Sequence, residues 1–94
     1  MTETPVAISH DRAQQRFETT IDGHLCVADY QLADGVMHMT HTVVHPALQG
    51  RGIAARLVEA AFAYARAEHL KIDPLCSYVR VYMQRHPETE SLRA

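Results

Sequence analysis

The sequence predicts a mixed α/β (α+β) fold: an antiparallel three-stranded meander, followed by a helix, a parallel strand and a short C-terminal helix. Strand-like segments separated by Asp-Gly turns predict the meander. Apolar residues with helical spacing over 53–65 predict an amphipathic helix. A short apolar segment follows, and a helix that joins two strands of one sheet places them in parallel. The 94 residues are enough for one domain with one modest core.

The meander is defined by its turns. Asp22-Gly23 is a strong signal for a two-residue hairpin, and the Ala-Asp-Gly sequence at 33–35 marks a second turn. Pro46 ends the third strand, because proline has no N–H for a sheet ladder. The predicted strands are RFETTI (16–21), HLCVADYQL (24–32) and VMHMTHTVV (36–44).

The predicted central helix begins near Gly50–Gly52 and ends at about His69. Charged side chains lie mostly away from its apolar face, as expected for a helix packed on a sheet. That face consists of Ile53, Leu57, Val58, Ala61, Phe62 and Ala65.

The C-terminal part of the chain predicts one more strand and one more helix. LKIDPLC at 70–76 is short and apolar, which favours a strand. The segment SYVRVYMQRHPE follows, with Ser77 as the expected N-cap and Pro87 as the end of the helix. We therefore expect a flexible lead at 1–13, a folded domain at 14–88 and a frayed tail at 89–94.

Composition excludes several classes of function. The net charge of −2 argues against bulk binding of nucleic acid, which requires a basic face. The sequence has no apolar run of about 18 residues, as a membrane span requires, and its polar N-terminus lacks the pattern of a signal peptide. Two cysteines without a secretion signal favour a reducing compartment. We expect a cytoplasmic protein with neither membrane nor nucleic-acid partners.

The loop Gln49-Gly50-Arg51-Gly52 stands directly before the central helix. A helix N-terminus has about four unpaired N–H groups and roughly half a positive charge. Glycines leave those groups unobstructed and Arg51 adds a mobile cation, so a phosphate or pyrophosphate is the natural ligand. The alternative is a helix start that only needs a bend. Walker and Rossmann phosphate loops are excluded, because neither of their glycine patterns is present.

Residues 49–54 match Q/R-x-x-G-x-G/A and so resemble the acyl-CoA pyrophosphate loop of the GNAT (N-acetyltransferase) superfamily. THTVV, GRGIAARLVEAA and PLCSYVRVYMQRHPE resemble the small, single-domain branch of GNAT-like proteins. The resemblance covers about residues 16–88. It implies a GNAT-like fold and a transferase with acetyl-CoA or coenzyme A as cosubstrate and no metal.

The resemblance also implies a cofactor site. Backbone N–H groups of Gly50 to Ala54 would bind the pyrophosphate, and the strand end at Val43 and Val44 would pair with the pantetheine arm. The superfamily often carries a glutamate base on this strand, whereas this sequence has the two valines. The implied cofactor-binding residues are Val43, Val44, Gln49, Gly50, Arg51, Gly52, Ile53, Ala54 and Tyr78.

His41 is the candidate general base. It shares strand parity with Met37 and Met39, so we expect it to point with the apolar set, where burial would keep the imidazole neutral. The alternative is a core histidine bonded to a backbone carbonyl. A zinc site with His38 and His45 is disfavoured, because His38 and His41 should point to opposite faces of the strand.

Cys76 and Tyr82 are the other catalytic candidates. A thiol near a helix N-terminus is shifted toward thiolate, so Cys76 could accept the acetyl group transiently. The alternative is a small buried hydrophobe. The resemblance implies that Tyr82 protonates the departing thiolate, with Tyr78 one turn earlier as the alternative, while simple packing would also explain both tyrosines.

The predicted reaction is acetyl transfer to an unidentified amine, either a small molecule or a peptide group. A CoA-binding or acyl-CoA-binding module with little transferase activity is the alternative, because the usual acidic base is absent. A purely structural or interaction domain is a third possibility. The choice between monomer and homodimer stays open.

Overall fold

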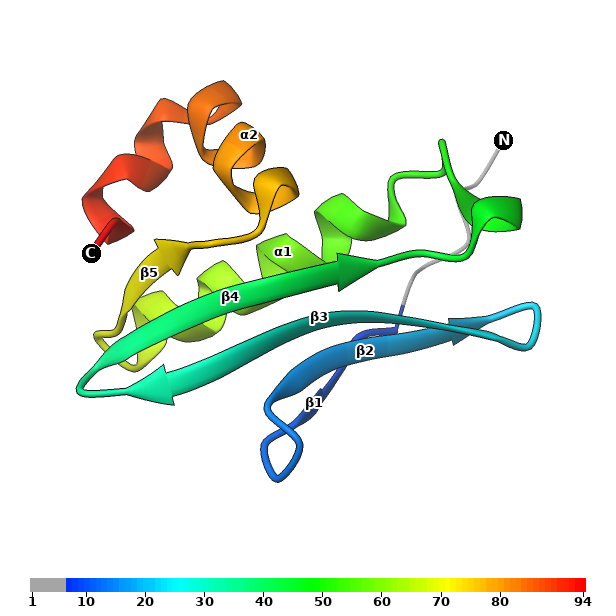
Figure 1. The fold of residues 1–94 in the computed structure, drawn as a ribbon, viewed down its shortest axis with the longest axis horizontal. Helices are drawn as coiled ribbons and strands as arrows, with labels where there is room; N and C mark the ends of the chain where they lie inside the picture. The colour runs from blue at the N-terminus through cyan, green and yellow to red at the C-terminus, as the bar shows by residue number, and fades with distance from the viewer. Residues whose placement is uncertain (1–6) are drawn as a thin grey trace.

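The computed structural model describes residues 7–94, which form one five-stranded sheet with two α-helices packed against it (Figure 1). The strand order is β1-β2-β3-β4-β5. The first four strands are antiparallel neighbours, and β4 pairs with β5 in parallel. This arrangement confirms the predicted mixed α/β class. The strands are β1 (Ser9–Asp11), β2 (Arg16–Ile21), β3 (His24–Ala33), β4 (Val36–Val43) and β5 (Lys71–Pro74).

Helix α1 (Ile53–Ala67) crosses behind the sheet and connects β4 to β5, as the parallel crossover requires (Figure 1). Helix α2 (Ser77–Arg85) follows β5, and short 3-10 helices η1 (Pro46–Leu48) and η2 (Pro87–Leu92) precede α1 and follow α2. None of the helices in the described part of the chain is long and apolar enough to cross a membrane.

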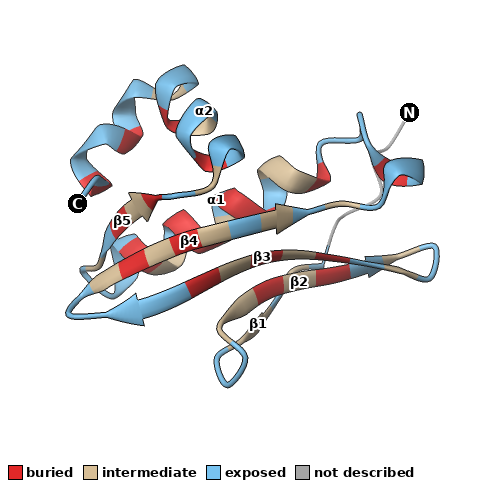
Figure 2. Cartoon of the chain, viewed as in Figure 1, coloured by how far each residue is buried: buried red, intermediate tan, exposed pale blue. Residues whose placement is uncertain are grey.

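The core lies between the sheet and the helices. All the apolar residues predicted for the helix face are buried in α1, which confirms the amphipathic helix predicted from their 3.6-residue spacing (Figure 2). Met37 and Met39 from β4, Ile72 from β5 and Met83 from α2 are fully buried in the same cluster. On β3, the side chains between the buried ones point to the opposite face, where apolar Leu25 and Val27 are followed by polar Asp29 and Gln31, so only one face of this strand is covered by the core.

Two hairpins have the geometry that their sequences predict. Asp22 and Gly23 have φ values of 52° and 77°, and Asp34 and Gly35 have φ values of 51° and 77°. Positive φ at both central residues is the property of type I′ turns, which Asp-Gly favours. The hairpins lie at opposite ends of β3, one at each end of the sheet.

Both predicted chain ends differ from the structure. The expected lead at 1–13 includes β1, which pairs with β2; residues 1–6 lie outside the described part. The expected frayed tail is ordered, because η2 buries Thr89 and Leu92. Beyond η2, the N–H of Ala94 donates to the carbonyl of Ile72 at 2.8 Å, so the chain end adds to the sheet beside β5.

The pH dependence of folding should reveal how β1 is attached. His10 stacks on Phe17 with ring centroids 4.0 Å apart, and its Nε2 lies 2.6 Å from the Tyr30 hydroxyl. Burial, followed by the nearby Arg12 charge, lowers the pKa of His10 below the ordinary 6.5, against a smaller opposing effect of Asp11. The folded protein therefore favours neutral His10, so its contribution to stability is complete above about pH 6.5 and is lost as pH falls through the lower folded pKa.

We expect the melting temperature of the wild type to fall more between about pH 8 and pH 5 than that of a His10→Phe variant. Phenylalanine preserves the stacked ring but cannot take up a proton. Melting followed by circular dichroism measures both proteins under matched salt. An equal loss in the two proteins would show that His10 does not control the acid sensitivity of β1.

Candidate functional site

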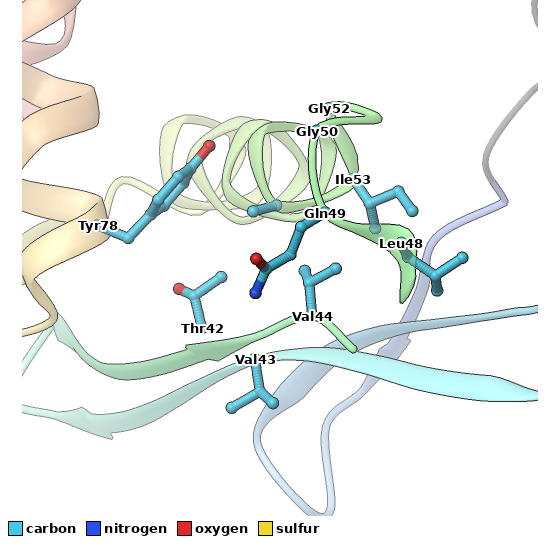
Figure 3. Close-up of a pocket in the computed structure, with 10 residues that line it drawn as sticks. Thr42, Val43, Val44, Leu48, Gln49, Gly50, Gly52, Ile53 and Tyr78 are labelled. Atoms are coloured by element: carbon cyan, nitrogen blue, oxygen red, sulfur yellow. The ribbon is translucent and has the colours of Figure 1, made fainter. Parts of the chain in front are cut away.

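The main cavity opens where β4 and β5 separate. Their parallel pairing runs from Val36 opposite Lys71 to Met39 opposite Pro74, and the N–H of Cys76 then donates to the Met39 carbonyl at 2.9 Å. Beyond that point β4 continues while the chain after β5 turns into α2. The separation leaves a cavity of about 560 Å³ between β4, the start of α1 and the start of α2 (Figure 3). Its lining residues are Thr42, Val43, Val44, Leu48, Gln49, Gly50, Gly52, Ile53, Ala54 and Tyr78.

The backbone of the glycine loop explains why its glycines are needed. Gly50 and Gly52 have φ values of 84° and 77°, in the left-handed region that favours glycine. A Cβ at either position would meet no atom within 4 Å. The left-handed backbone, and not a lack of space, is therefore the reason for glycine at these two positions. Gly52 is the N-cap of α1 and supplies no side-chain cap, and the first turn contains no acidic residue. The N–H groups of that turn also lack intrahelical partners, so, as far as the described residues go, the positive end of α1 is uncapped where it borders the cavity.

The structure brings together all of the predicted cofactor-binding residues except Arg51. Figure 3 shows Val44 and Gln49 pointing into the space between β4 and α1, and Val43 pointing away from it. Arg51 turns toward the β2–β3 hairpin instead, where its Nη1 lies 3.3 Å from Asp22 Oδ2. Thr42 and Leu48 also line the cavity, and the sequence did not lead us to predict either of them. For Leu48, an apolar residue directly before a phosphate-type loop was a signal that could have indicated a role in the cavity wall.

A β-bulge in β4 changes which face its residues occupy. Asp29 pairs with His41 and Tyr30 pairs with Met39, so Thr40 is an extra residue on β4. The bulge reverses side-chain parity, and Thr42 faces the helices as Met39 does.

The predicted burial of His41 is therefore wrong: the side chain is exposed and does not line the main cavity. His41 borders a second, polar hollow of about 430 Å³ that Arg16, Asp29 and Thr40 also line. The bulge also places His38 and His41 on the same face of β4, so the prediction that they point to opposite faces is wrong.

Metal-ligating side chains do not gather in the described part of the chain. His38 Nδ1 lies 2.7 Å from Asp73 Oδ2, across the parallel pair β4 and β5. The described residues contain no group of three or more His, Cys, Asp or Glu side chains that could hold a metal ion. His45 Nδ1 instead accepts a hydrogen bond from the Ala47 N–H at 3.0 Å.

Cys76 lies at the border of the cavity. It is the N-cap of α2, so the prediction of Ser77 as the N-cap is wrong: Ser77 is the first helical residue. Its Sγ lies 3.6 Å from Oγ1 of Thr42, a residue of the cavity wall. Partial burial alone would raise the pKa of the Cys76 thiol, but the N–H groups of Val79 and Tyr78 and the Thr42 hydroxyl stabilise the thiolate, so the pKa is lowered. Cys76 is therefore a free, partly accessible thiol whose lowered pKa favours the thiolate form.

The two candidate tyrosines lie in different surroundings. Tyr78 lines the cavity, and in Figure 3 its hydroxyl points toward α1. Tyr82 does not line it: its ring contacts Phe62 edge-on at 5.5 Å and stacks on His86 at 4.0 Å. Burial, followed by the charge of Glu59, raises the pKa of both phenols above the ordinary 10.0, so both stay protonated at neutral pH. Tyr78 therefore borders the cavity, whereas Tyr82 packs outside it.

Comparisons with known proteins agree with this architecture. The family model of the GCN5-related N-acetyltransferases matches residues 16–92. Protein NATD1 of Mus musculus is 31% identical over 86 residues, covering 88% of this chain and 78% of that protein. Protein NATD1 of Danio rerio is 26% identical over 93 residues, covering 95% of this chain and 84% of that protein.

A solution structure shares the fold. It is a GCN5-like protein from Staphylococcus aureus, with a TM-score of 0.76 and 23% identity, and the match covers 95% of this chain and 88% of that one. Taken with the sequence match over most of the domain, this fold identifies the chain as a small protein that belongs to the GCN5-related N-acetyltransferase family.

Proposed function

We propose that the protein is an acetyl-CoA-dependent N-acetyltransferase that acts on an amine. The observation that carries this proposal is the open N-terminus of α1, whose glycine-rich loop lines the cavity beside β4. Such a terminus binds phosphate groups through its free N–H groups and its dipole. Family membership supports acetyl transfer as the reaction. We assign the protein to the cytoplasm, where Cys26 and Cys76 would remain reduced.

The proposed binding mode uses backbone groups. N–H groups of Gly50 to Ala54 would hold the diphosphate of CoA. Beyond Met39, β4 no longer pairs with β5, so its backbone groups at Val43 and Val44 can pair with the amides of the pantetheine arm. An arm that follows β4 from the loop toward its bulge would bring the thioester close to Thr42 and Cys76.

The proposed chemistry follows from the polar groups at that end of the cavity. The Cys76 thiolate attacks the thioester carbonyl, the bond between the carbonyl carbon and the CoA sulfur breaks, and the departing thiolate takes a proton from Tyr78. The acetyl group is then carried on Cys76. A neutral amine attacks this new thioester, Cys76 leaves as a thiolate, and the proton lost from nitrogen returns to Tyr78 through solvent.

A CoA-binding or acyl-CoA-binding module with little transferase activity is the second candidate. The observation that favours it is that, among the residues that the structure describes, no Asp, Glu or His side chain lines the main cavity to accept a proton from an amine. Under this interpretation the loop binds CoA as proposed and the transfer step is slow.

Two measurements test both candidates. Calorimetry with CoA and acetyl-CoA measures binding, and chromatography measures CoA released from acetyl-CoA in the presence of a panel of amines and peptides. Saturable binding with amine-dependent release supports the transferase. Binding without release supports the second candidate, and absence of binding rejects both.

Tyr78→Phe should lower the maximal rate of acetyl transfer about 100-fold, within the range for loss of a general acid. The phenyl ring preserves packing, so we expect the dissociation constant for acetyl-CoA to change less than about threefold. Tyr82→Phe is the matched control, because it removes a hydroxyl from the same helix outside the cavity. Steady-state kinetics of both variants decides the assignment. A larger loss for Tyr82→Phe would return the role of proton donor to Tyr82.

A further inference from the structure

The loop before α1 is attached to the β2–β3 hairpin at two points. Arg51 donates from Nη1 to Asp22 Oδ2 at 3.3 Å. Next to it, the His24 and His45 rings stack with centroids 3.8 Å apart and an interplanar angle of 16°. The hairpin tip therefore lies against the loop that borders the main cavity.

Arg51 occupies an unusual place in this loop. Gly50 and Gly52 on either side of it line the cavity, whereas Arg51 itself does not. Its side chain is held outside by the carboxylate of Asp22, and the side chains of Arg51 and Asp22 are 52% and 70% exposed. An ion pair this exposed contributes at most about 1 kcal/mol, so a stronger anion can replace the carboxylate at little cost.

A diphosphate is such an anion. It has more charge than one carboxylate and offers several oxygens to the guanidinium, which binds phosphate through parallel N–H donors. With the diphosphate at the N–H groups of Gly50 to Ala54, the backbone of Arg51 would already adjoin it. The side chain would then only need to leave Asp22.

We propose that Asp22 is a positioning residue that holds Arg51 away from the cavity in the free protein, and that Arg51 moves to the diphosphate when CoA binds. This inference rests on the proposed function. Asp22 thereby lowers the affinity for CoA, because binding must first break its pair with Arg51. The stacked histidines keep the hairpin in place, so the exchange involves one side chain.

Asp22→Asn tests the proposal. Asparagine tolerates the positive φ of this turn position and keeps the shape of the side chain, but it has no charge. We expect calorimetry at low salt to show CoA binding about two- to fivefold tighter than in the wild type, the range that an exposed ion pair provides. Asp34→Asn is the matched control, because Asp34 has the same Asp-Gly turn and nearly the same φ in the β3–β4 hairpin at the far end of the sheet.

Making Asp22→Asn in the Arg51→Ala variant distinguishes two explanations: Arg51 moves from Asp22 to the diphosphate, or Asp22 repels the diphosphate directly. We expect Arg51→Ala to weaken CoA binding about five- to tenfold and to abolish the effect of Asp22→Asn. Unchanged affinity in Asp22→Asn overturns the proposal, and so does an equal gain with and without Arg51, which would mean direct repulsion by Asp22. If the wild type binds no CoA, the proposed function itself fails, which is a distinct result.

Discussion

Replacing Gly52 by glutamate is expected to weaken CoA binding by at least about 100-fold while the domain remains folded. The new carboxylate would stand at the N-cap of α1, where the proposed diphosphate binds. Two like charges about 5 Å apart repel by roughly 3 kcal/mol at the effective dielectric constant of a protein surface, which corresponds to about two orders of magnitude in affinity. The cost to folding is smaller. A left-handed residue with a side chain costs about 1–2 kcal/mol, and a carboxylate at a helix N-terminus recovers part of it.

Two control variants isolate the effect of the charge. Gly52→Ala introduces the same backbone strain without charge, and we expect it to reduce CoA affinity less than about fivefold. Gly35→Glu introduces the same charge at a glycine with the same φ of 77°, also with open space around its Cβ, at the far end of the sheet. Calorimetry with CoA and thermal melting should be measured on all three variants. If Gly52→Glu binds CoA as the wild type does, the diphosphate does not bind at this loop.

The glycine loop could be predicted from sequence because its geometry is local. Left-handed backbone at Gly50 and Gly52 is accessible to glycine at little cost, and the helix that follows is marked by its own apolar period. Both signals lie within a few residues, and no distant contact is needed to produce them. The turns at Asp22-Gly23 and Asp34-Gly35 were predictable for the same reason.

The position of His41 could not be predicted, because it depends on how two strands pair. The alternation of VMHMTHTV places His41 with Met37 and Met39, and no residue type in this segment marks the extra residue at Thr40. One inserted residue reverses the face of every residue after it. The same bulge brings Thr42 to the cavity, so a single non-local feature explains both the misplaced histidine and the missed threonine.

The ordered tail shows a second limit of local reasoning. Polar and charged residues dominate HPETESLRA, and this composition favours a frayed end. Leu92 is nevertheless buried in the core, and the N–H of Ala94 donates to the carbonyl of Ile72 on β5. The site that Leu92 occupies is formed only when the sheet and the helices are packed together, so the sequence of the tail alone cannot predict that it is anchored.

Cys76→Ala is expected to lower the maximal rate of acetyl transfer by at least about 100-fold, because it removes the proposed nucleophile. CoA affinity should stay within about threefold of the wild type, since Cys76 borders the cavity without lining it. Mass spectrometry of the wild type mixed with acetyl-CoA should detect an acetyl group on Cys76 before amine is added. Cys26 is fully buried and serves as the internal control for non-specific acetylation.

The lowered pKa of Cys76 makes the nucleophile role testable without an acceptor. Iodoacetamide should alkylate Cys76 at a rate whose pH midpoint lies below that of an ordinary thiol, and CoA should protect it. Thr42→Val removes the hydroxyl that stabilises the thiolate while keeping the side-chain volume, so it should move this midpoint upward and slow transfer at neutral pH. The two effects must occur together, because both depend on the fraction of thiolate. Transfer that persists at the wild-type rate in Cys76→Ala would instead mean that the amine attacks the thioester of acetyl-CoA directly, with the loop at Gly50 and Gly52 still holding the coenzyme.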